Sequence, residues 1–345
     1  MKLKSCILLS LALSVVLLFS CKSTETDSES LSYNGRILTE QLTQTKFDTS
    51  KALEEMSRER TNNKIPFTMN FEGCLGKPVI DFDPDYHVYM QIDTGCTRNW
   101  YFPSFLAKCD IQKDYFIQCI INNIRQNEPD ISEAHPDDKE LSHFLEEEWS
   151  KYNLNHLAQI YYNDLPLRYD TVLQESFDGV LGEDFLMQFE RVTFDYINHY
   201  IILNDEKLEG SHIPFILTPN NEILIYFEYN GQNELAMIDT GNYGFTPRLK
   251  IGDGNQDYDI NDYSNYGIGS SATPPETPRI MQTYNNIKIG NITYNKIKGA
   301  YSTIKGSGYN KGSQLHLMKL NNLGNVFFYE HVIQFDFINN ELIIK

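Results

Sequence analysis

The sequence predicts a mostly β protein made of two similar halves, with a small helical insertion in the first half. Tyr and Phe account for 22 and 20 of the 345 residues, and aromatic side chains favour strands. Segments such as KPVIDFD, HVYMQID, EILIYFEY and ELAMID alternate or run apolar over strand lengths, with Gly, Asn or Pro between them. Landmarks of the first half recur in the second half in the same order, which indicates an internal duplication.

The first 20 residues have the pattern of a targeting segment. Lys2 and Lys4 form a basic start, and an apolar run from Cys6 to Phe19 follows. A membrane-spanning helix needs about 20 apolar residues, so this shorter run favours a cleaved signal peptide over an uncleaved anchor. The stretch from Leu18 to Cys21 resembles the lipobox of bacterial lipoproteins, in which the cysteine is acylated. This resemblance implies a mature chain that begins at a lipidated Cys21 and is anchored in the bacterial cell envelope, facing the periplasm or the surface.

A polar tether is expected at residues 21–62, because this region is rich in Ser, Thr and acidic residues. Only the piece from Ser50 to Arg60 looks helical. The whole chain has a formal charge of −18, from 47 acidic residues against 29 Lys and Arg. Because no basic patch stands out, we expect no nucleic-acid partner.

Four landmarks define the repeat that follows the tether. The matched pairs are Ile65-Pro66-Phe67 with Ile213-Pro214-Phe215, Asp93-Thr94-Gly95 with Asp239-Thr240-Gly241, Leu181-Gly182 with Leu323-Gly324, and FDYINHYIIL from Phe194 with FDFINNELII from Phe335. The spacing between partners stays between 141 and 148 residues. We therefore expect two similar lobes, at residues 63–205 and 206–345.

Two local patterns add detail to this plan. The acidic stretch from Glu128 to Tyr152 is helix-like and lies in the first half only, so we expect a surface insertion whose charges face solvent. In the second half, NNIKIGNITYNKIKGAYS predicts a hairpin with Gly290-Asn291 at its turn.

The two Asp-Thr-Gly triplets carry the chemistry. Glycine allows the tight turn after each apolar strand, and the threonine hydroxyl can bond backbone groups and brace the loop. Two such loops related by a two-fold axis would bring Asp93 and Asp239 face to face. Two close carboxyl groups cannot both ionise easily, so they share one proton. One can then accept a proton from water while the other donates one to a carbonyl oxygen.

These features resemble the aspartic proteases, specifically the pepsin and retropepsin-like group. That family uses one such triplet from each of two lobes, and a later apolar-apolar-Gly element supports each loop. Val180-Leu181-Gly182 and Asn322-Leu323-Gly324 correspond to that element, and the resemblance covers roughly residues 65–345. It implies a pseudo-two-fold bilobal fold and a membrane-tethered endopeptidase that acts on a peptide or protein substrate.

The resemblance also implies the roles of the site residues. Asp93 and Asp239 would be the catalytic pair that activates water, and neither a metal nor a cofactor is needed. The residues that would hold the two loops are Thr94, Gly95, Thr240 and Gly241. Because both lobes lie in one chain, we expect an active monomer.

Departures from the family pattern leave an alternative open. Cys96 and Asn242 stand where the family has Ser, Thr or Ala, and Asn322 replaces an apolar residue. A catalytically silent, peptide-binding lipoprotein with the same fold is therefore the second interpretation. The family also closes a hairpin over its substrate, often with a tyrosine at the tip. Tyr161, Tyr162 or Tyr266-Gly267 could serve, and none is assigned.

Besides Cys21, the mature chain would keep Cys74, Cys96, Cys109 and Cys119. An exported protein permits disulfides. Cys109 with Cys119 closes a short loop and is the preferred pair, and four thiols are the alternative. The cysteine spacing lacks the CxxC pairs of a zinc site, the acidic run at 253–264 lacks the glycine and glutamate of a calcium loop, and no GxSxG motif is present.

Overall fold

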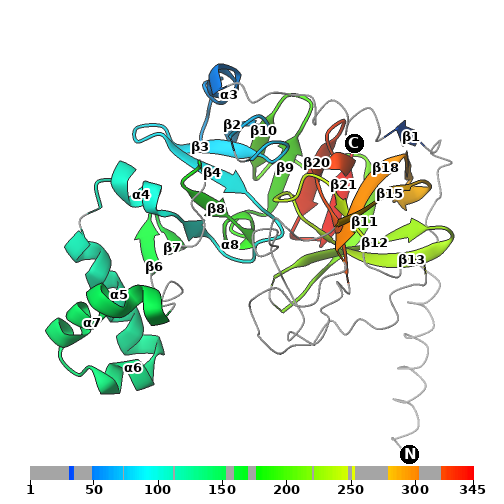
Figure 1. Cartoon of the computed structure of the whole chain (residues 1–345). Helices are drawn as coiled ribbons and strands as arrows, with labels where there is room; N and C mark the ends of the chain where they lie inside the picture. The colour runs from blue at the N-terminus through cyan, green and yellow to red at the C-terminus, as the bar shows by residue number, and fades with distance from the viewer. Residues whose placement is uncertain are drawn as a thin grey trace, which may run out of the picture. The chain divides into compact units, whose positions relative to one another are not determined.

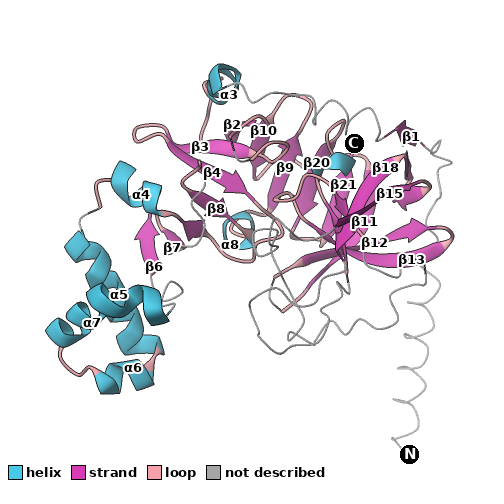
Figure 2. Cartoon of the chain, viewed as in Figure 1, coloured by secondary structure: helices cyan, strands magenta, loops and turns pink. Residues whose placement is uncertain are grey.

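A computed structural model describes residues 31–34, 49–72, 74–111, 113–152, 159–169, 176–219, 221–247, 251–252, 279–302 and 320–345. The expected signal peptide and Cys21 lie outside these ranges. The protein is mostly β, as the sequence predicts, and its strands join into one large mixed sheet (Figure 1, Figure 2). Among the described residues, no helix is long and apolar enough to cross a membrane.

In the first half of the chain, a block of helices interrupts the strands. The strands are β1 (Leu31–Asn34), β2 (Lys64–Thr68), β3 (Val79–Asp83), β4 (Val88–Ile92), β5 (Trp100–Tyr101), β6 (Gln159–Tyr162), β7 (Leu165–Tyr169), β8 (Gly179–Leu181), β9 (Arg191–Asp195) and β10 (Tyr200–Leu203). The helices are α3 (Thr49–Met56), α4 (Pro103–Lys108), α5 (Lys113–Asn127), α6 (Pro129–Ala134), α7 (Asp138–Tyr152) and α8 (Glu183–Leu186).

In the second half, the described residues are nearly all strand or turn. The elements are β11 (Ser211–Leu217), β12 (Ile223–Tyr229), β13 (Gln232–Ile238), β14 (Phe245–Thr246), β15 (Arg279–Tyr284), β16 (Ile287–Ile289), β17 (Ile292–Asn295), β18 (Ile297–Ser302), β19 (Asn321–Leu323), the 3-10 turn η4 (Asn325–Phe327), β20 (Val332–Asp336) and β21 (Glu341–Ile344).

Six antiparallel strands connect the two halves, in the order β2-β10-β9-β20-β21-β11. The two middle strands, β9 and β20, come from different halves. Their register centres on Thr193 opposite Gln334, and Gln334 Nε2 donates to Thr193 Oγ1 at 2.9 Å. Both side chains are buried, so this hydrogen bond satisfies polar atoms at the middle of the sheet.

Each half also holds a parallel pair of strands. β4 runs parallel to β8, with Ile92 opposite Leu181, and β13 runs parallel to β19, with Ile238 opposite Leu323. These four side chains are fully buried, which fits the apolar runs that the sequence shows there. The carboxyl ends of β4 and β13 are thus fixed against the core.

The hairpin predicted at Gly290-Asn291 is confirmed. Ile289 pairs with Ile292 across a two-residue turn, and Gly290 has a φ of 59°. A positive φ is what a two-residue hairpin turn needs. A Cβ at Gly290 would also lie 2.3 Å from Ser211 Oγ, so a larger residue there would have to displace the Ser211 side chain.

The helical segment in the first half is longer than predicted. It begins at Pro103 rather than Glu128, because α4 and α5 precede the acidic stretch. In α5, Ile117, Ile120, Ile121 and Ile124 follow the spacing of one helix face, and the last three are buried. Isoleucine favours strands by propensity, so here the period of the apolar residues outweighs their intrinsic preference.

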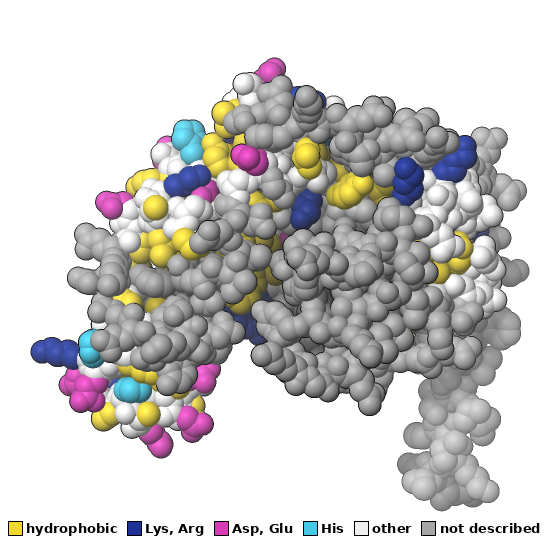
Figure 3. Space-filling model, viewed as in Figure 1, with side chains coloured by type: hydrophobic (Ala, Val, Ile, Leu, Met, Phe, Trp, Pro, Cys, Tyr) yellow, Lys and Arg dark blue, Asp and Glu magenta, His cyan; other side chains and the backbone are white. Residues whose placement is uncertain are grey.

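The acidic stretch itself lies on the surface, as predicted. Residues 136–140 are exposed, whereas Leu141 and Leu145 of α7 face the core. In Figure 3, acidic side chains gather at the lower left of the view, in the region where Figure 1 places α6 and α7. Asp137, Asp138, Lys139 and Glu140 of the charge run therefore face solvent.

The last part of the expected tether packs against the sheet. Ala52 and Met56 of α3 are buried, and Thr68 Oγ1 of β2 donates to the buried Glu55 carboxylate. The ordered body of the protein therefore includes Thr49–Met56, within the 21–62 region that composition alone assigns to the tether.

The predicted bond between Cys109 and Cys119 is wrong, and the alternative of four thiols holds for the cysteines that the structure describes. The two sulfur atoms have different partners. Cys109 directly follows α4 and lies near Tyr162 of β6, whereas Cys119 lies near Tyr115 one turn earlier in α5.

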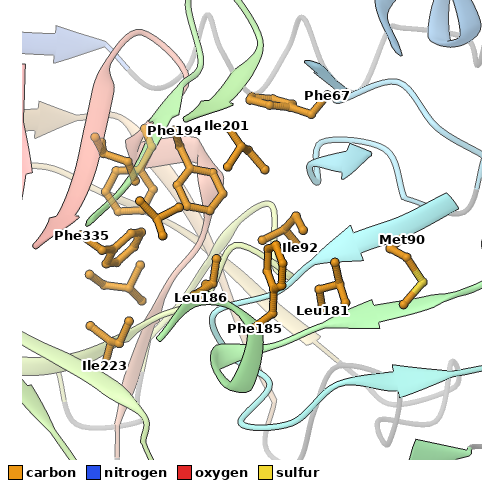
Figure 4. Close-up of a cluster of buried hydrophobic side chains, with 14 of the residues drawn as sticks. Phe67, Met90, Ile92, Leu181, Phe185, Leu186, Phe194, Ile201, Ile223 and Phe335 are labelled. Atoms are coloured by element: carbon orange, nitrogen blue, oxygen red, sulfur yellow. The ribbon is translucent and has the colours of Figure 1, made fainter. Parts of the chain in front are cut away.

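One continuous cluster of buried apolar side chains spans both halves of the chain. Figure 4 shows Met90, Ile92 and Leu181 from the parallel pair of the first half, and Phe194 and Phe335 from the central sheet. The rings of Phe194 and Phe335 meet edge to face with centroids 5.8 Å apart. Because this core is shared, it positions the ends of β4 and β13 relative to each other.

Candidate active site

Two matching loops leave the ends of β4 and β13. The backbone N–H of Asp93 donates to Leu181 O, and that of Asp239 donates to Leu323 O, each at 3.0 Å. Three residues further on, Cys96 N–H donates to Asp93 O and Asn242 N–H donates to Asp239 O, each at 3.1 Å. Both aspartates therefore lie in the same kind of tight turn, directly after a buried strand.

The two threonines join the loops to each other. Thr94 N–H donates to Thr240 Oγ1, and Thr240 N–H donates to Thr94 Oγ1, each at 3.0 Å. Each hydroxyl then donates to a carbonyl across the contact, Thr94 to Ile238 O at 2.8 Å and Thr240 to Ile92 O at 2.9 Å. Both threonine side chains are fully buried. Four hydrogen bonds away from water thus fix one loop against the other.

Each glycine lies against the carboxyl group of the opposite loop. A Cβ built on Gly241 would lie 2.0 Å from Asp93 Oδ2, and one built on Gly95 would lie 2.5 Å from Asp239 Cγ. Any side chain at either position would collide with a carboxylate. The glycines are therefore needed for close approach, and the structure brings together all six residues of the two predicted triplets.

The two carboxyl groups interact directly. Burial and the neighbouring Asp239 carboxylate raise the pKa of Asp93 well above its usual range, and a side-chain hydrogen bond joins the two groups. Lys77 and the Gly95 N–H act in the opposite direction but do not compensate. The raised pKa favours the protonated form of the Asp93 carboxyl group, compared with an isolated aspartate.

The later glycine elements pack directly under the loops. A Cβ on Gly182 would lie 2.2 Å from Cys96 O, and one on Gly324 would lie 2.3 Å from Gly244 O. The residue after each glycine donates its N–H to the same loop, Glu183 to Cys96 O at 2.8 Å and Asn325 to Asn242 O at 2.9 Å. These elements support the loops in both halves.

The side chains that follow the two glycines differ, and the sequence did not reveal their roles. Asn325 is fully buried and donates to Thr240 O, Asn242 O and Gly76 O, while its own oxygen accepts from Tyr196. It braces the second loop. The sequence feature that could have indicated this role is the position of Asn325, a polar residue directly after the supporting Gly324.

Glu183, at the corresponding place in the first half, is a buried carboxylic acid. Its Oε1 accepts the Ile223 N–H at 3.1 Å, and its Oε2 has no hydrogen-bond partner among the described residues. Burial raises the pKa of Glu183 well above its usual range, and the nearby Glu222 and Asp93 add to the shift.

Two amide side chains contact the aspartates and were not assigned from the sequence. Gln91 Nε2 donates to Asp93 Oδ2 at 3.3 Å, and Asn322 Nδ2 donates to Asp239 Oδ2 at 2.5 Å. The signal was present, because each is a polar residue inside a buried strand. In the sequence, Asn322 was noted only because it replaces an apolar residue of the aspartic protease pattern.

The residues directly after the triplets point elsewhere. The thiol of Cys96 donates to Arg98 O at 3.0 Å, and burial with the nearby Asp93 charge raises the pKa of this thiol. Asn242 Nδ2 donates to Asn322 Oδ1 at 2.8 Å. Neither side chain donates to an aspartate in the hydrogen bonds that the structure describes.

Of the tyrosines considered for a flap, Tyr162 is the one whose side chain the structure describes. Tyr162 lies in β6 and donates to Asp83 Oδ2 at 2.6 Å. Tyr161 also lies in β6, and Tyr266-Gly267 falls outside the described residues. Within the ranges that the structure describes, no group of His, Cys, Asp and Glu could hold a metal ion.

Neither a scan against protein-family models nor a search of curated proteins finds a match for this chain. The interpretation of the site therefore depends on its geometry. Two neighbouring carboxyl groups, on loops that buried hydrogen bonds fix to each other, have the chemistry to accept one proton and donate another whenever one of them is protonated and the other is ionised.

Proposed function

We propose that this protein is an aspartic endopeptidase, in which Asp93 and Asp239 activate a water molecule for attack on a peptide bond. The observation that carries the proposal is the reciprocal bonding of Thr94 and Thr240, because it holds the two carboxyl groups within reach of one shared proton. The resemblance to the pepsin and retropepsin-like proteases agrees with this arrangement.

The proposed reaction needs only the two carboxyl groups and water. The water oxygen bonds to the carbonyl carbon, its proton passes to the ionised carboxylate, and the protonated carboxyl gives its proton to the carbonyl oxygen. The resulting tetrahedral gem-diol collapses as the C–N bond breaks. The departing amine takes a proton from one carboxyl group, and a hydroxyl of the gem-diol returns its proton to the other carboxylate. The products are a carboxylic acid and an amine, and the pair again holds one proton.

We also propose that the two halves are duplicated lobes of a bilobal fold, with boundaries at residues 63–205 and 206–345. The support is that matching strands pair alike: β4 with β8 and β13 with β19 in parallel, and β2 with β10 and β11 with β21 antiparallel. Since one chain supplies both aspartates, we propose an active monomer.

Membrane attachment through Cys21 remains part of the proposal. The support is the lipobox-like stretch that ends at this residue. Replacing Cys21→Ser should move the protein from the membrane fraction to the soluble fraction of bacteria that produce it. A protein that stays with the membrane after this change would contradict attachment through Cys21.

The decisive experiment is cleavage of a mixed peptide library by the full chain in detergent, between about pH 3 and 7. We expect the wild-type protein to cleave internal peptide bonds. Asp93→Asn and Asp239→Asn each keep the side-chain shape, and we expect each to reduce cleavage by more than about 1,000-fold, because the shared proton is lost. Retained peptide binding without cleavage by the wild type would instead support the peptide-binding alternative.

A further inference from the structure

We propose that Gln91 and Asn322 are positioning residues, each of which fixes the carboxyl group of one aspartate. This inference rests on the proposed function, because it concerns how the same pair is held. Each amide donates to an Oδ2 atom, Gln91 to that of Asp93 and Asn322 to that of Asp239. The two donors come from different strands, β4 and β19.

Their places in the two parallel strand pairs are complementary. Gln91 in β4 lies opposite Val180 in β8, whereas Met237 in β13 lies opposite Asn322 in β19. Each of these two residue pairs therefore contains one amide and one apolar side chain. In the first half the amide lies on the strand that ends in the aspartate, whereas in the second half it lies on the neighbouring strand. As a result, each aspartate has one amide donor.

A second layer of donors sets the orientation of both amides. The Cys74 thiol donates to Gln91 Oε1 at 3.2 Å, and Asn242 Nδ2 donates to Asn322 Oδ1 at 2.8 Å. Because the amide oxygens accept these bonds, the NH₂ groups must face the carboxylates. Asn242 is fixed in turn, since its own oxygen accepts the Gly244 N–H at 3.1 Å.

Burial strengthens the hydrogen bonds from the two amides to the aspartates. Gln91 is 4% exposed and Asn322 is 7% exposed, so water competes little for their N–H groups. The side chains of Cys96 and Asn242 donate to Arg98 O and to Asn322 rather than to an aspartate. Asn242 keeps an indirect role, through Asn322.

A donor that faces a carboxylate favours its ionised form. Loss of either amide should therefore raise the pH at which the pair gains its second proton, and this pH sets the acidic limb of the activity profile. It should also let the carboxyl plane rotate, which lowers kcat more than it changes KM.

Two substitutions test this directly. Each introduces the residue type found at the corresponding position of the other half, Met237 for Gln91 and Val180 for Asn322. We expect Gln91→Met and Asn322→Val each to lower kcat/KM about 10- to 100-fold, the usual effect of losing a hydrogen bond to a charged group. The acidic limb should move up by about one pH unit, with KM changed less than about threefold.

Gln334→Met is the matched control, because it removes another buried glutamine from a strand that contacts neither aspartate. It should lower thermal stability and leave the pH profile in place. A shift of the acidic limb in Gln334→Met as large as in Gln91→Met would overturn the positioning role.

The relay through Asn242 gives an independent test that keeps Asn322 in place. Asn242→Ala should lower kcat/KM in the wild-type background and have little further effect in the Asn322→Val background, because its route to Asp239 is already broken. Simple additivity of the two substitutions would contradict the relay.

A measurement without substrate separates this inference from the proposed function. Carboxyl carbon NMR of aspartate-labelled protein reports the two titrations of the pair directly. If the wild type does not cleave peptides but Asn322→Val still moves the lower titration upward, the function fails and the positioning role stands. If the wild type cleaves but both titrations and the acidic limb are unchanged in Gln91→Met and Asn322→Val, the positioning role fails and the function stands.

Discussion

Thr94 and Thr240 bond each other twice, each backbone N–H reaching the hydroxyl of the other at 3.0 Å. Their hydroxyls also donate to Ile238 O and Ile92 O, the carbonyls directly before the opposite aspartates. A displacement of either loop must therefore break hydrogen bonds in both. This relationship makes the separation of the two loop backbones a property of the fold.

Removing one hydroxyl should destabilise the protein. Thr94→Val leaves the Thr240 N–H and Ile238 O buried without their partner, and each such group costs about 1–3 kcal/mol. We expect a clearly lower free energy of unfolding in urea and a large loss of cleavage. Thr94→Ser keeps the hydroxyl and serves as the control. Equal stability of the Val and Ser variants would show that the reciprocal bonds contribute little.

A side chain on either glycine should disable the site. In Gly241→Ala the new Cβ would lie 2.0 Å from Asp93 Oδ2, so the carboxyl group must move. A displacement of about 1 Å can cost about 100-fold in rate, and we expect a loss of that size in kcat. Gly244→Ala is the control, because nothing lies within 4 Å of a Cβ there. Similar activities for the two variants would contradict this account of the loop.

Stability should decrease as the pH rises. The pKa values of Asp93 and Glu183 are raised in the folded state, above ordinary values of 3.8 and 4.5. The folded protein thus holds protons that the unfolded chain has released, and the stabilisation is complete below the unfolded values and is lost as the pH rises through the folded ones. We expect Tm to fall as the pH is raised from about 4.5 towards neutral.

Glu183→Gln isolates part of this effect. The charged groups around Glu183 are Glu222, Asp93 and Asp184, all acidic, so none of them stabilises its ionised form. The variant should show a flatter dependence of Tm on pH, whereas Glu190→Gln on the surface should not change it. An unchanged slope in Glu183→Gln would mean that Glu183 does not titrate in this range.

An ion pair adds to the apolar contacts that attach the helical segment. Lys108 at the end of α4 donates to Asp178 Oδ2 at 2.6 Å and to His87 O at 2.7 Å, and the Asp178 side chain is 1% exposed. Lys108→Met leaves this buried carboxylate without its cation, and we expect a loss of about 3 kcal/mol. Faster hydrogen exchange in α4 would report it.

Two comparisons check that prediction. Lys139→Met removes an exposed cation from α7 and should have little effect on stability or exchange. Adding Asp178→Asn to Lys108→Met should recover part of the loss, because no unpaired charge remains buried. If the double variant is as unstable as Lys108→Met alone, the cost has another origin.

The sequence predicted the residues that backbone geometry demands. A strand that ends in Asp-Thr-Gly has few alternatives, because glycine supplies the close approach and threonine the brace, so the six loop residues could be named in advance. The hairpin at Gly290-Asn291 was equally local. In both cases the information lies within a few neighbouring residues.

The parts that the sequence did not predict depend on contacts between distant segments. Gln91 and Asn322 could not be matched to their aspartates, because the pairing of β4 with β8 and of β13 with β19 sets which side chain reaches which carboxyl group. The start of the helical segment was missed for a different reason. Isoleucine-rich α5 has the composition of a strand, and only its spacing indicates a helix.

The central ladder between β9 and β20 has a practical consequence. Residues 204–210 link β10, the last strand of the first half, to β11, the first strand of the second half. A cut in this link would leave all six strands of the central ladder able to pair. We expect two separately produced fragments to reassemble through this ladder. Reassembly of these fragments would show that the pairing of β9 with β20, rather than the covalent link, holds the two halves of the chain together.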